Sequence, residues 1–181
     1  LALMTCASLL TPLAFAQEAP PDIEYVREVS YRDGDPAWRL DYARPNNVVD
    51  ALPAVVVIHG GGWIEGDKSS YDPLILDWAQ RGYFAMSINY RLATTTQASF
   101  PQAIQDCKCA IRWLRAHAVA HRVDKNRIGV YGSSAGGHLA LLVGILRDVH
   151  EPEWDGDGPY AEESSDVCAV VSDSGIVSLD A

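Results

Sequence analysis

Two short glycine-containing segments hold the residue types from which a covalent catalyst could be built. The first, Gly132-Ser133-Ser134-Ala135-Gly136, lies where the strand-like run "RIGVYGS" passes into the helix-like run "AGGHLALLVGIL". A strand that turns into a helix within about two residues projects its central side chain at the N-terminus of the helix, where backbone N–H groups favour negative charge. Gly132 and Gly136 leave room for such a turn, which makes Ser134 a candidate nucleophile. Taken alone, the pattern fits equally well a serine that caps a helix, followed by packing glycines.

The second segment is "HGGGW" at residues 59–63, which directly follows the β-branched run "AVVVI". Three consecutive glycines let backbone N–H groups approach a ligand atom closely. Two such donors, together with the N–H group that follows Ser134, would form an oxyanion hole. The alternative is a flexible glycine loop without a ligand. The two motifs lie 75 residues apart, each at the end of an expected strand, and this order favours the catalytic interpretation.

The elements around these motifs predict an α/β fold with a mostly parallel sheet and helices on both faces. Residues 23–32 and 37–45 read as an antiparallel hairpin, and the later strands read as buried on both faces. Asp72 is expected to cap the first helix and Gly82 to end it. The expected buried strands cover 54–60, 83–91, 127–133 and 167–175, the expected helices cover 71–82, 100–123 and 135–146, and 147–166 is an expected polar loop.

Length and charge exclude several classes of protein. The chain has 181 residues, enough for one domain with a sizeable core. Its formal net charge of −10 disfavours nucleic acid as a partner, because an acidic surface repels phosphates. The apolar runs of the sequence fall short of the roughly 18 residues that suggest a membrane span.

The N-terminal residues predict export. Residues 1–16 read as the apolar part of a signal peptide, with the small-x-small pattern Ala14-Phe15-Ala16 before the cleavage point, and 17–22 as a linker. A buried N-terminal helix is the alternative, but Pro12 and the prolines that follow disfavour it. A lipoprotein attached through Cys6 is a weaker alternative. We therefore expect a periplasmic or secreted protein.

Cysteines and acidic residues give no metal site. Export makes disulfides conceivable, but Cys107, Cys109 and Cys168 are odd in number and the sequence leaves their pairing open. The spacing of Cys and His residues does not match a zinc site. Asp155 and Asp157 in "DGDG" predict a turn, because the sequence offers too few further ligands there to form a calcium site.

The chain resembles the α/β-hydrolase superfamily, and within it the esterase branch that carries an HGGG motif. The resemblance rests on "HGGGW", "SINYRL", "FPQAIQDCKCAIRWLR", "DKNRIGVYGSSAGGHLA" and "VSDSG" and covers residues 23–180. It is nearest to bacterial exported carbohydrate esterases of the feruloyl or acetyl esterase kind. The resemblance implies that Ser134 is the nucleophile and that the N–H groups of Gly61, Gly62 and Ala135 hold the oxyanion. The supporting residues it implies are His59, Gly60, Gly132 and Gly136.

In this family the acid and the histidine of the triad come later in the chain than the nucleophile. We therefore expect 23–181 to be the N-terminal portion of a catalytic domain, with both groups outside it and the 181-residue chain inactive by itself. His138 is expected to pack beneath the turn at Ser134, and Asp173 comes too early to be the triad acid. The other histidines after the glycine loop are expected to be exposed, namely His117, His121 and His150.

The expected function is that of a serine carboxylic-ester hydrolase that needs no cofactor and acts on a small-molecule or carbohydrate ester. Two alternatives remain. One is an amidase or peptidase of the same fold, of the formamidase or prolyl-oligopeptidase kind. The other is a binding module that keeps the fold without the chemistry. The sequence leaves the oligomeric state open.

Overall fold

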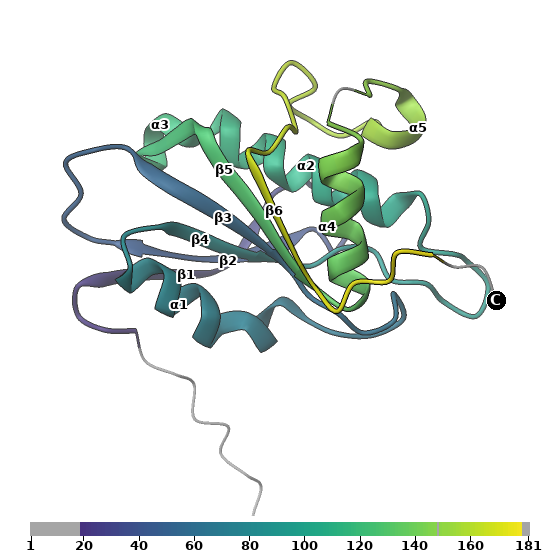
Figure 1. The fold of residues 1–181 in the computed structure, drawn as a ribbon, viewed down its shortest axis with the longest axis horizontal. Helices are drawn as coiled ribbons and strands as arrows, with labels where there is room; N and C mark the ends of the chain where they lie inside the picture. The colour runs from purple at the N-terminus through teal and green to yellow at the C-terminus, as the bar shows by residue number, and fades with distance from the viewer. Residues whose placement is uncertain (1–18, 148, 179–181) are drawn as a thin grey trace, which may run out of the picture.

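A single six-stranded sheet organises the chain (Figure 1). The computed structural model describes residues 19–147 and 149–178, so the expected signal segment 1–16 lies outside the described residues. The strands follow the order β1-β2-β4-β3-β5-β6 across the sheet.

The sheet is antiparallel at its start and parallel afterwards, as predicted. Strand β1 (Ile23–Ser30) pairs with β2 (Arg39–Pro45) as a hairpin, and β2 pairs antiparallel with β4 (Phe84–Ile88). Strand β3 (Leu52–Ile58) lies in parallel between β4 and β5 (Val123–Ser133), and β6 (Ala169–Asp173) extends the parallel part. The carboxyl ends of β3 and β5, which carry the two motifs, therefore meet at the same edge.

Helices cover both faces of the sheet, which confirms the predicted layers (Figure 1). On one face, α1 (Asp72–Gln80) follows the short 3-10 helix η1 (Lys68–Tyr71) and packs on Val55, Val57 and Ala85. On the other face, α2 (Gln102–Ala116) and α4 (Ala135–Ile145) pack on alternate residues of the same strands, such as Val56 and Ile58. Because successive strand residues point to opposite faces, one β-branched run supplies both cores.

Three details of the helices differ from the prediction. The helix expected over 100–123 ends at Ala116 and resumes as α3 (Ala118–His121). At the break, Nδ1 of His117 donates to the Trp113 carbonyl at 2.8 Å, so the side chain shares the acceptor that the helix backbone uses. The polar loop 147–166 contains a short helix, α5 (Pro152–Asp155). Asp72 is the first residue of α1 and not its cap.

The stripe of small and apolar residues that defines the inner face of the long helix is buried as expected. Its members are Ile104, Cys107, Ile111, Leu114 and Ala118.

The prediction of a fully buried last strand is wrong. Strand β6 is the outermost strand of the described sheet, and α4 packs on only one of its faces. Val171 on β6 is 53% exposed, and Cys168 just before the strand is also exposed. A run of β-branched residues indicates a strand, whereas the burial of that strand depends on which elements cover it.

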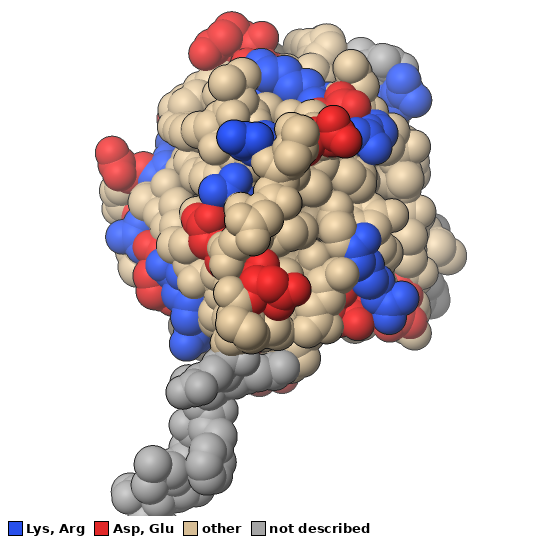
Figure 2. Space-filling view, turned by 90° about the vertical axis from the view of Figure 1, so that its left-hand side faces the viewer, with Lys and Arg blue, Asp and Glu red and all other residues tan. Residues whose placement is uncertain are grey.

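Charges of both signs share the surface. Figure 2 shows acidic and basic side chains interspersed over the side of the molecule that carries α3 and the loop before β3. Within the described residues, the helices are all too short or too polar to cross a membrane.

Candidate active site

Ser134 occupies a strained turn between β5 and α4. Its backbone has φ 52° and ψ −119°, outside the regions that a residue with a side chain ordinarily adopts. The N–H group of Ser134 donates to the Asp173 carbonyl at 2.8 Å, and its own carbonyl accepts from the His138 N–H at 3.0 Å. These two bonds hold the turn, while the Ser134 residue stays exposed to solvent. Strained backbone that is held in this way is typical of functional positions.

The flanking glycines are required by close approach of the backbone. A Cβ atom on Gly132 would lie 2.0 Å from the carbonyl oxygen of Gly136. A Cβ atom on Gly136 would lie 2.2 Å from the carbonyl oxygen of Ile58, at the end of β3. Any side chain at either position would force the turn away from the sheet. The Gly-x-Ser-x-Gly spacing therefore fits the sharp strand-to-helix turn expected at Ser134.

The glycine loop lies directly against this turn. A Cβ atom on Gly60 would lie 3.2 Å from Cβ of Ser134 and 2.9 Å from the Ser133 carbonyl oxygen. Gly61 has φ 117° and Gly62 has φ 59°, both in the left-handed region. The segment 59–63, 75 residues earlier in the sequence, thus meets the candidate nucleophile in space. Ala135 is the first residue of α4, so its N–H group has no partner within the helix and remains a candidate third donor.

His59 holds the start of the loop through its side chain. The His59 residue is 2% exposed, and its Nδ1 donates to the Gly60 carbonyl at 2.7 Å. The ring stacks on Tyr90 with centroids 4.4 Å apart, and the Tyr90 hydroxyl donates to the His59 carbonyl at 3.0 Å. Burial lowers the pKa of the imidazole, so the ring stays neutral near pH 7. This arrangement fits the bracing role expected of His59.

A carboxylate holds the other end of the loop. Asp67 accepts from the Ser69 N–H at 2.8 Å and from Nδ2 of Asn89, at the end of β4, also at 2.8 Å. Burial opposes its ionisation, but these hydrogen bonds prevail and lower the pKa of Asp67 to about 2. The next residue, Lys68, is 2% exposed, and its Nζ lies 3.0 Å from the buried carboxylate of Asp41 and also contacts Glu28. The loop is therefore fixed at both ends to the sheet.

His138 lies beside the turn at Ser134 and not beneath it as predicted. Its ring meets Trp63 edge-on at 5.5 Å between centroids, and its Nδ1 donates to the Ile176 carbonyl at 2.7 Å. Four residues after Ser134, it projects from the same side of the helix, whereas Gly136 and Gly137 face the sheet. Within the described residues, the Ser134 hydroxyl makes no hydrogen bond with any histidine side chain.

The prediction of exposed histidines holds for His150 alone. His117 stacks on Trp113 with centroids 4.6 Å apart. His121 lies between Tyr42 and Phe84, with centroids 5.0 and 5.2 Å away. Both rings are half-buried, because they pack against these aromatic side chains near the break between α2 and α3. They lie at the opposite ends of the strands from Ser134 and take no part in the site.

The two aspartates of "DGDG" bind basic side chains of other segments. Asp155 faces Lys108 and Arg112, and Asp157 binds Arg32 at 2.8 Å. Across the described part of the chain, groups of three or more His, Cys, Asp or Glu side chains that could hold a metal ion do not occur. The three described cysteines are free thiols, so neither pairing with Cys168 is formed.

Sequence reasoning missed the residues that fasten the two motifs. Tyr90, Asn89 and Asp67 support the glycine loop, and the Asp173 backbone supports the turn at Ser134. The side chain of Asp173 also lies 3.4 Å from the Ser133 hydroxyl. The available signal was the position of "NY" directly after β4 and of "SDSG" at the end of β6, the strands that neighbour β3 and β5.

Comparisons with known proteins identify the family of the chain. The family model BD-FAE matches residues 40–181. Among curated proteins, the esterase LipC of Mycobacterium tuberculosis is 35% identical over 147 residues, which cover 80% of this chain and 35% of LipC. The carboxylesterase NlhH of the same organism is 38% identical over 60% of this chain and 34% of NlhH. The chain thus spans about a third of the length of these relatives.

Solved structures of esterases share the fold. A bifunctional GH43-CE protein of Bacteroides eggerthii matches with a TM-score of 0.76 and 31% identity, over 83% of this chain and 21% of that protein. A truncated carbohydrate esterase from gut microbiota matches with a TM-score of 0.73 and 26% identity, over 86% of this chain and 59% of that protein. On these similarities and on its site geometry, the chain belongs to the BD-FAE family of the α/β-hydrolase esterases.

Proposed function

We propose that the protein is a serine carboxylic-ester hydrolase with Ser134 as its nucleophile. The observation that carries the proposal is the position of Ser134, an exposed serine at φ 52° in a turn whose neighbour in space is the glycine loop. Relatives named esterase and carboxylesterase support the same reaction class.

The proposed reaction passes through an acyl-enzyme. The Ser134 hydroxyl attacks the ester carbonyl carbon and loses its proton to a histidine base. The N–H groups of Gly61, Gly62 and Ala135 stabilise the negative oxygen of the tetrahedral intermediate. The alcohol then departs with a proton, and water releases the acid from Ser134. We place the base and its carboxylate partner outside the described residues, because the five histidines of the chain all lie within them and none of their rings bonds to the Ser134 hydroxyl.

The proposed substrates are esters of carbohydrates. Their acyl group is a small acyl group, such as acetyl, or a feruloyl group. Support comes from two structural neighbours, one a bifunctional GH43-CE protein and the other a carbohydrate esterase. An exported enzyme would meet such substrates outside the cell, and we retain export as part of the proposal.

The test is ester hydrolysis by the full-length protein. We expect turnover of p-nitrophenyl acetate that Ser134→Ala abolishes and that Ser133→Ala largely keeps. The two serines are adjacent, so the second variant controls for general damage to the turn. Equal loss in both variants, or full activity in Ser134→Ala, would contradict the assignment. Faster turnover of a p-nitroanilide than of the matching ester would instead support an amidase.

A further inference from the structure

A buried cation lies five residues after the glycine loop. Nζ of Lys68 is 3.0 Å from the fully buried Asp41 carboxylate of β2 and also contacts the Glu28 carboxylate of β1. Nε of Arg27 lies farther from Asp41, at 3.6 Å, and its side chain is 45% exposed. Burial opposes the charge of Lys68, but its hydrogen bonds to the two carboxylates prevail and raise its pKa. Lys68 therefore stays charged at neutral pH inside the fold.

A bulge in β1 completes the partners of Asp41. The register of β1 against β2 shifts between Val26 and Val29, and Glu28 within this shift has φ 60°, which is uncommon for a residue with a side chain. The Glu28 N–H group donates to Oδ1 of Asp41 at 2.7 Å, while Oδ2 accepts from Nζ of Lys68. Both oxygens of the buried carboxylate are thus bonded. Bulges and strained residues of this kind are over-represented near active sites.

The backbone between Lys68 and the glycine loop folds back onto that loop. The Glu65 N–H group donates to the Gly61 carbonyl at 3.1 Å. A Cβ atom on Gly66 would lie 2.5 Å from Nδ1 of His59, the first residue of the loop, so the two segments touch without room for a side chain. Gly66 precedes Lys68 by only two residues. A shift of Lys68 would therefore pass directly to the backbone of the glycine loop.

Lys68 ties this segment to two strands beyond the one that carries the loop. Its N–H group donates to Oδ1 of Asn89, just after β4, at 2.7 Å, and its Nζ binds Asp41 on β2. The glycine loop itself follows β3. An oxyanion donor must lie about 2.7–3.1 Å from the developing charge, and a displacement of about 1 Å can lower a rate a hundredfold. The anchor at Lys68 therefore bears on the rate of the reaction as well as on stability.

We propose that Lys68 is a positioning residue for ester hydrolysis, which sets the place of the oxyanion donors in the glycine loop by binding Asp41 and Glu28. The inference rests on the proposed serine hydrolase reaction and adds a residue outside the site that determines its rate. Because Lys68 is buried, it acts through the backbone of the loop. Loss of its charge should lower kcat, which depends on stabilisation of the tetrahedral intermediate, and leave KM nearly unchanged.

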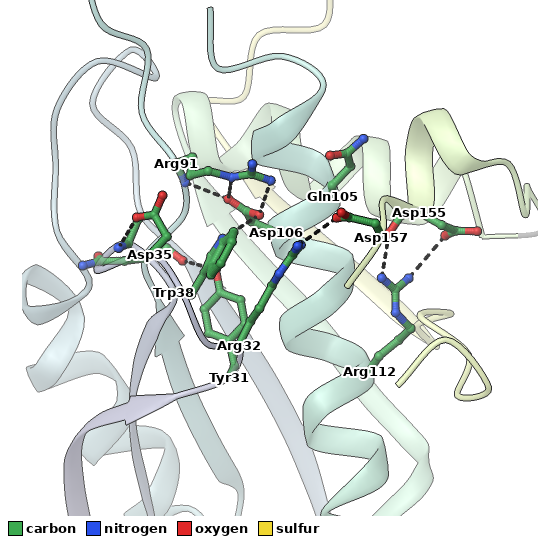
Figure 3. A network of polar contacts seen from close by, with 12 residues as sticks. Tyr31, Arg32, Asp35, Trp38, Arg91, Gln105, Asp106, Arg112, Asp155 and Asp157 are labelled. Atoms are coloured by element: carbon green, nitrogen blue, oxygen red, sulfur yellow. Dashed lines mark hydrogen bonds and ion pairs between the residues drawn. The ribbon is translucent and has the colours of Figure 1, made fainter. Parts of the chain in front are cut away.

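A second buried lysine provides the matched control. Lys108 on α2 is fully buried, and its Nζ binds the Asp155 carboxylate and the Val149 carbonyl oxygen, both in the segment after α4. The same aspartate also binds Arg112, as Figure 3 shows. Lys108 therefore resembles Lys68 in burial and in its ion pair, but its partners do not belong to the segments that hold the glycine loop.

The test compares Lys68→Met with Lys108→Met in the full-length protein, with p-nitrophenyl acetate as the substrate. The value of kcat is referred to the concentration of active sites that a fluorophosphonate labels to completion, so unfolded molecules do not lower it. Lys68→Met should lower kcat by about ten- to a hundredfold and change KM by less than about twofold. Lys108→Met should keep the wild-type kcat, although both variants lose a buried ion pair and are less stable.

A milder variant guards against a failure to fold. Glu28→Gln removes one charge from the cluster at a side chain that is 65% exposed, and it should lower kcat less than Lys68→Met does. Equal kcat in Lys68→Met and Lys108→Met would overturn the positioning role while leaving ester hydrolysis intact. If Lys68→Met does not fold, a wild-type kcat in Glu28→Gln would overturn it in the same way. A folded wild-type protein that cleaves no ester and takes no label would overturn the proposed function itself, and the inference with it.

Discussion

Alanine at Gly61 and alanine at Gly62 should have different effects, although the two glycines are neighbours. A Cβ atom on Gly61 would lie 2.0 Å from the Glu65 carbonyl oxygen, whereas Cβ atoms essentially never approach within 3.0 Å. The backbone must therefore move by about 1 Å, and displacements of this size can lower a rate about a hundredfold. A Cβ atom on Gly62 has its nearest neighbour at 3.9 Å, the Ile64 side chain.

Both variants also lose the conformational freedom of glycine. Gly62 has φ 59°, in the left-handed helical region, which costs an alanine about 1–2 kcal/mol. Gly61 has φ 117°, which is less accessible to alanine, and carries the steric clash in addition. We expect Gly61→Ala to lower kcat about a hundredfold, as the loss of one oxyanion donor does, and to destabilise the fold by more than Gly62→Ala does.

The assay is p-nitrophenyl acetate hydrolysis by the full-length protein, with urea unfolding of each variant measured in parallel. Gly62→Ala should lose about 1–2 kcal/mol of unfolding free energy and less kcat than Gly61→Ala. Wild-type kcat and stability in Gly61→Ala would refute the reasoning. A larger stability loss in Gly62→Ala than in Gly61→Ala would refute it as well.

Three further predictions concern the residues around the site. Asp106→Ala should lower the unfolding free energy by about 3 kcal/mol or more, because it leaves Arg91 and the Trp38 indole without their acceptor; urea unfolding that matches wild type would contradict this. Burial, with repulsion from Arg44 and His117, lowers the pKa of His121 in the folded protein. Below about pH 7 the unfolded chain therefore binds more protons at this site than the folded chain does, so the free energy of unfolding should fall as the pH drops from about 7 to about 5. His121→Phe should flatten this dependence, and an unchanged slope would exclude His121 as its source. Cys168 is exposed, whereas Cys107 and Cys109 are buried and burial raises the pKa of their thiols. A thiol reagent should therefore modify Cys168 much faster than Cys107 or Cys109, and Cys168→Ser should remove the fast phase of the modification.

The sequence predicts the strands and both motifs well because each depends on local chemistry. The β-branched run of β3 needs burial on both faces, and the glycines around Ser134 are required by backbone contacts of 2.0 and 2.2 Å. The expected α/β-hydrolase fold is confirmed by the sheet order and by the esterase neighbours.

The parts that sequence reasoning missed depend on contacts between distant segments. Whether β6 is buried depends on the elements that pack beside it, and its own residues do not record which elements these are. His117 and His121 look like surface residues at a helix end, but Tyr160 packs against His117 and Tyr42 packs against His121. The pair of Arg91 and Asp106 joins the segment after β4 to α2 across 15 positions, so no local sequence pattern predicts it.

The role of Ser134 as the nucleophile can be tested directly by covalent labelling. The full-length protein is treated with a fluorophosphonate, and the modified residue is located by mass spectrometry of its peptides. We expect one adduct on Ser134, retained in Ser133→Ala and lost in Ser134→Ala. An adduct on another residue, or labelling of Ser134→Ala at the wild-type rate, would contradict it.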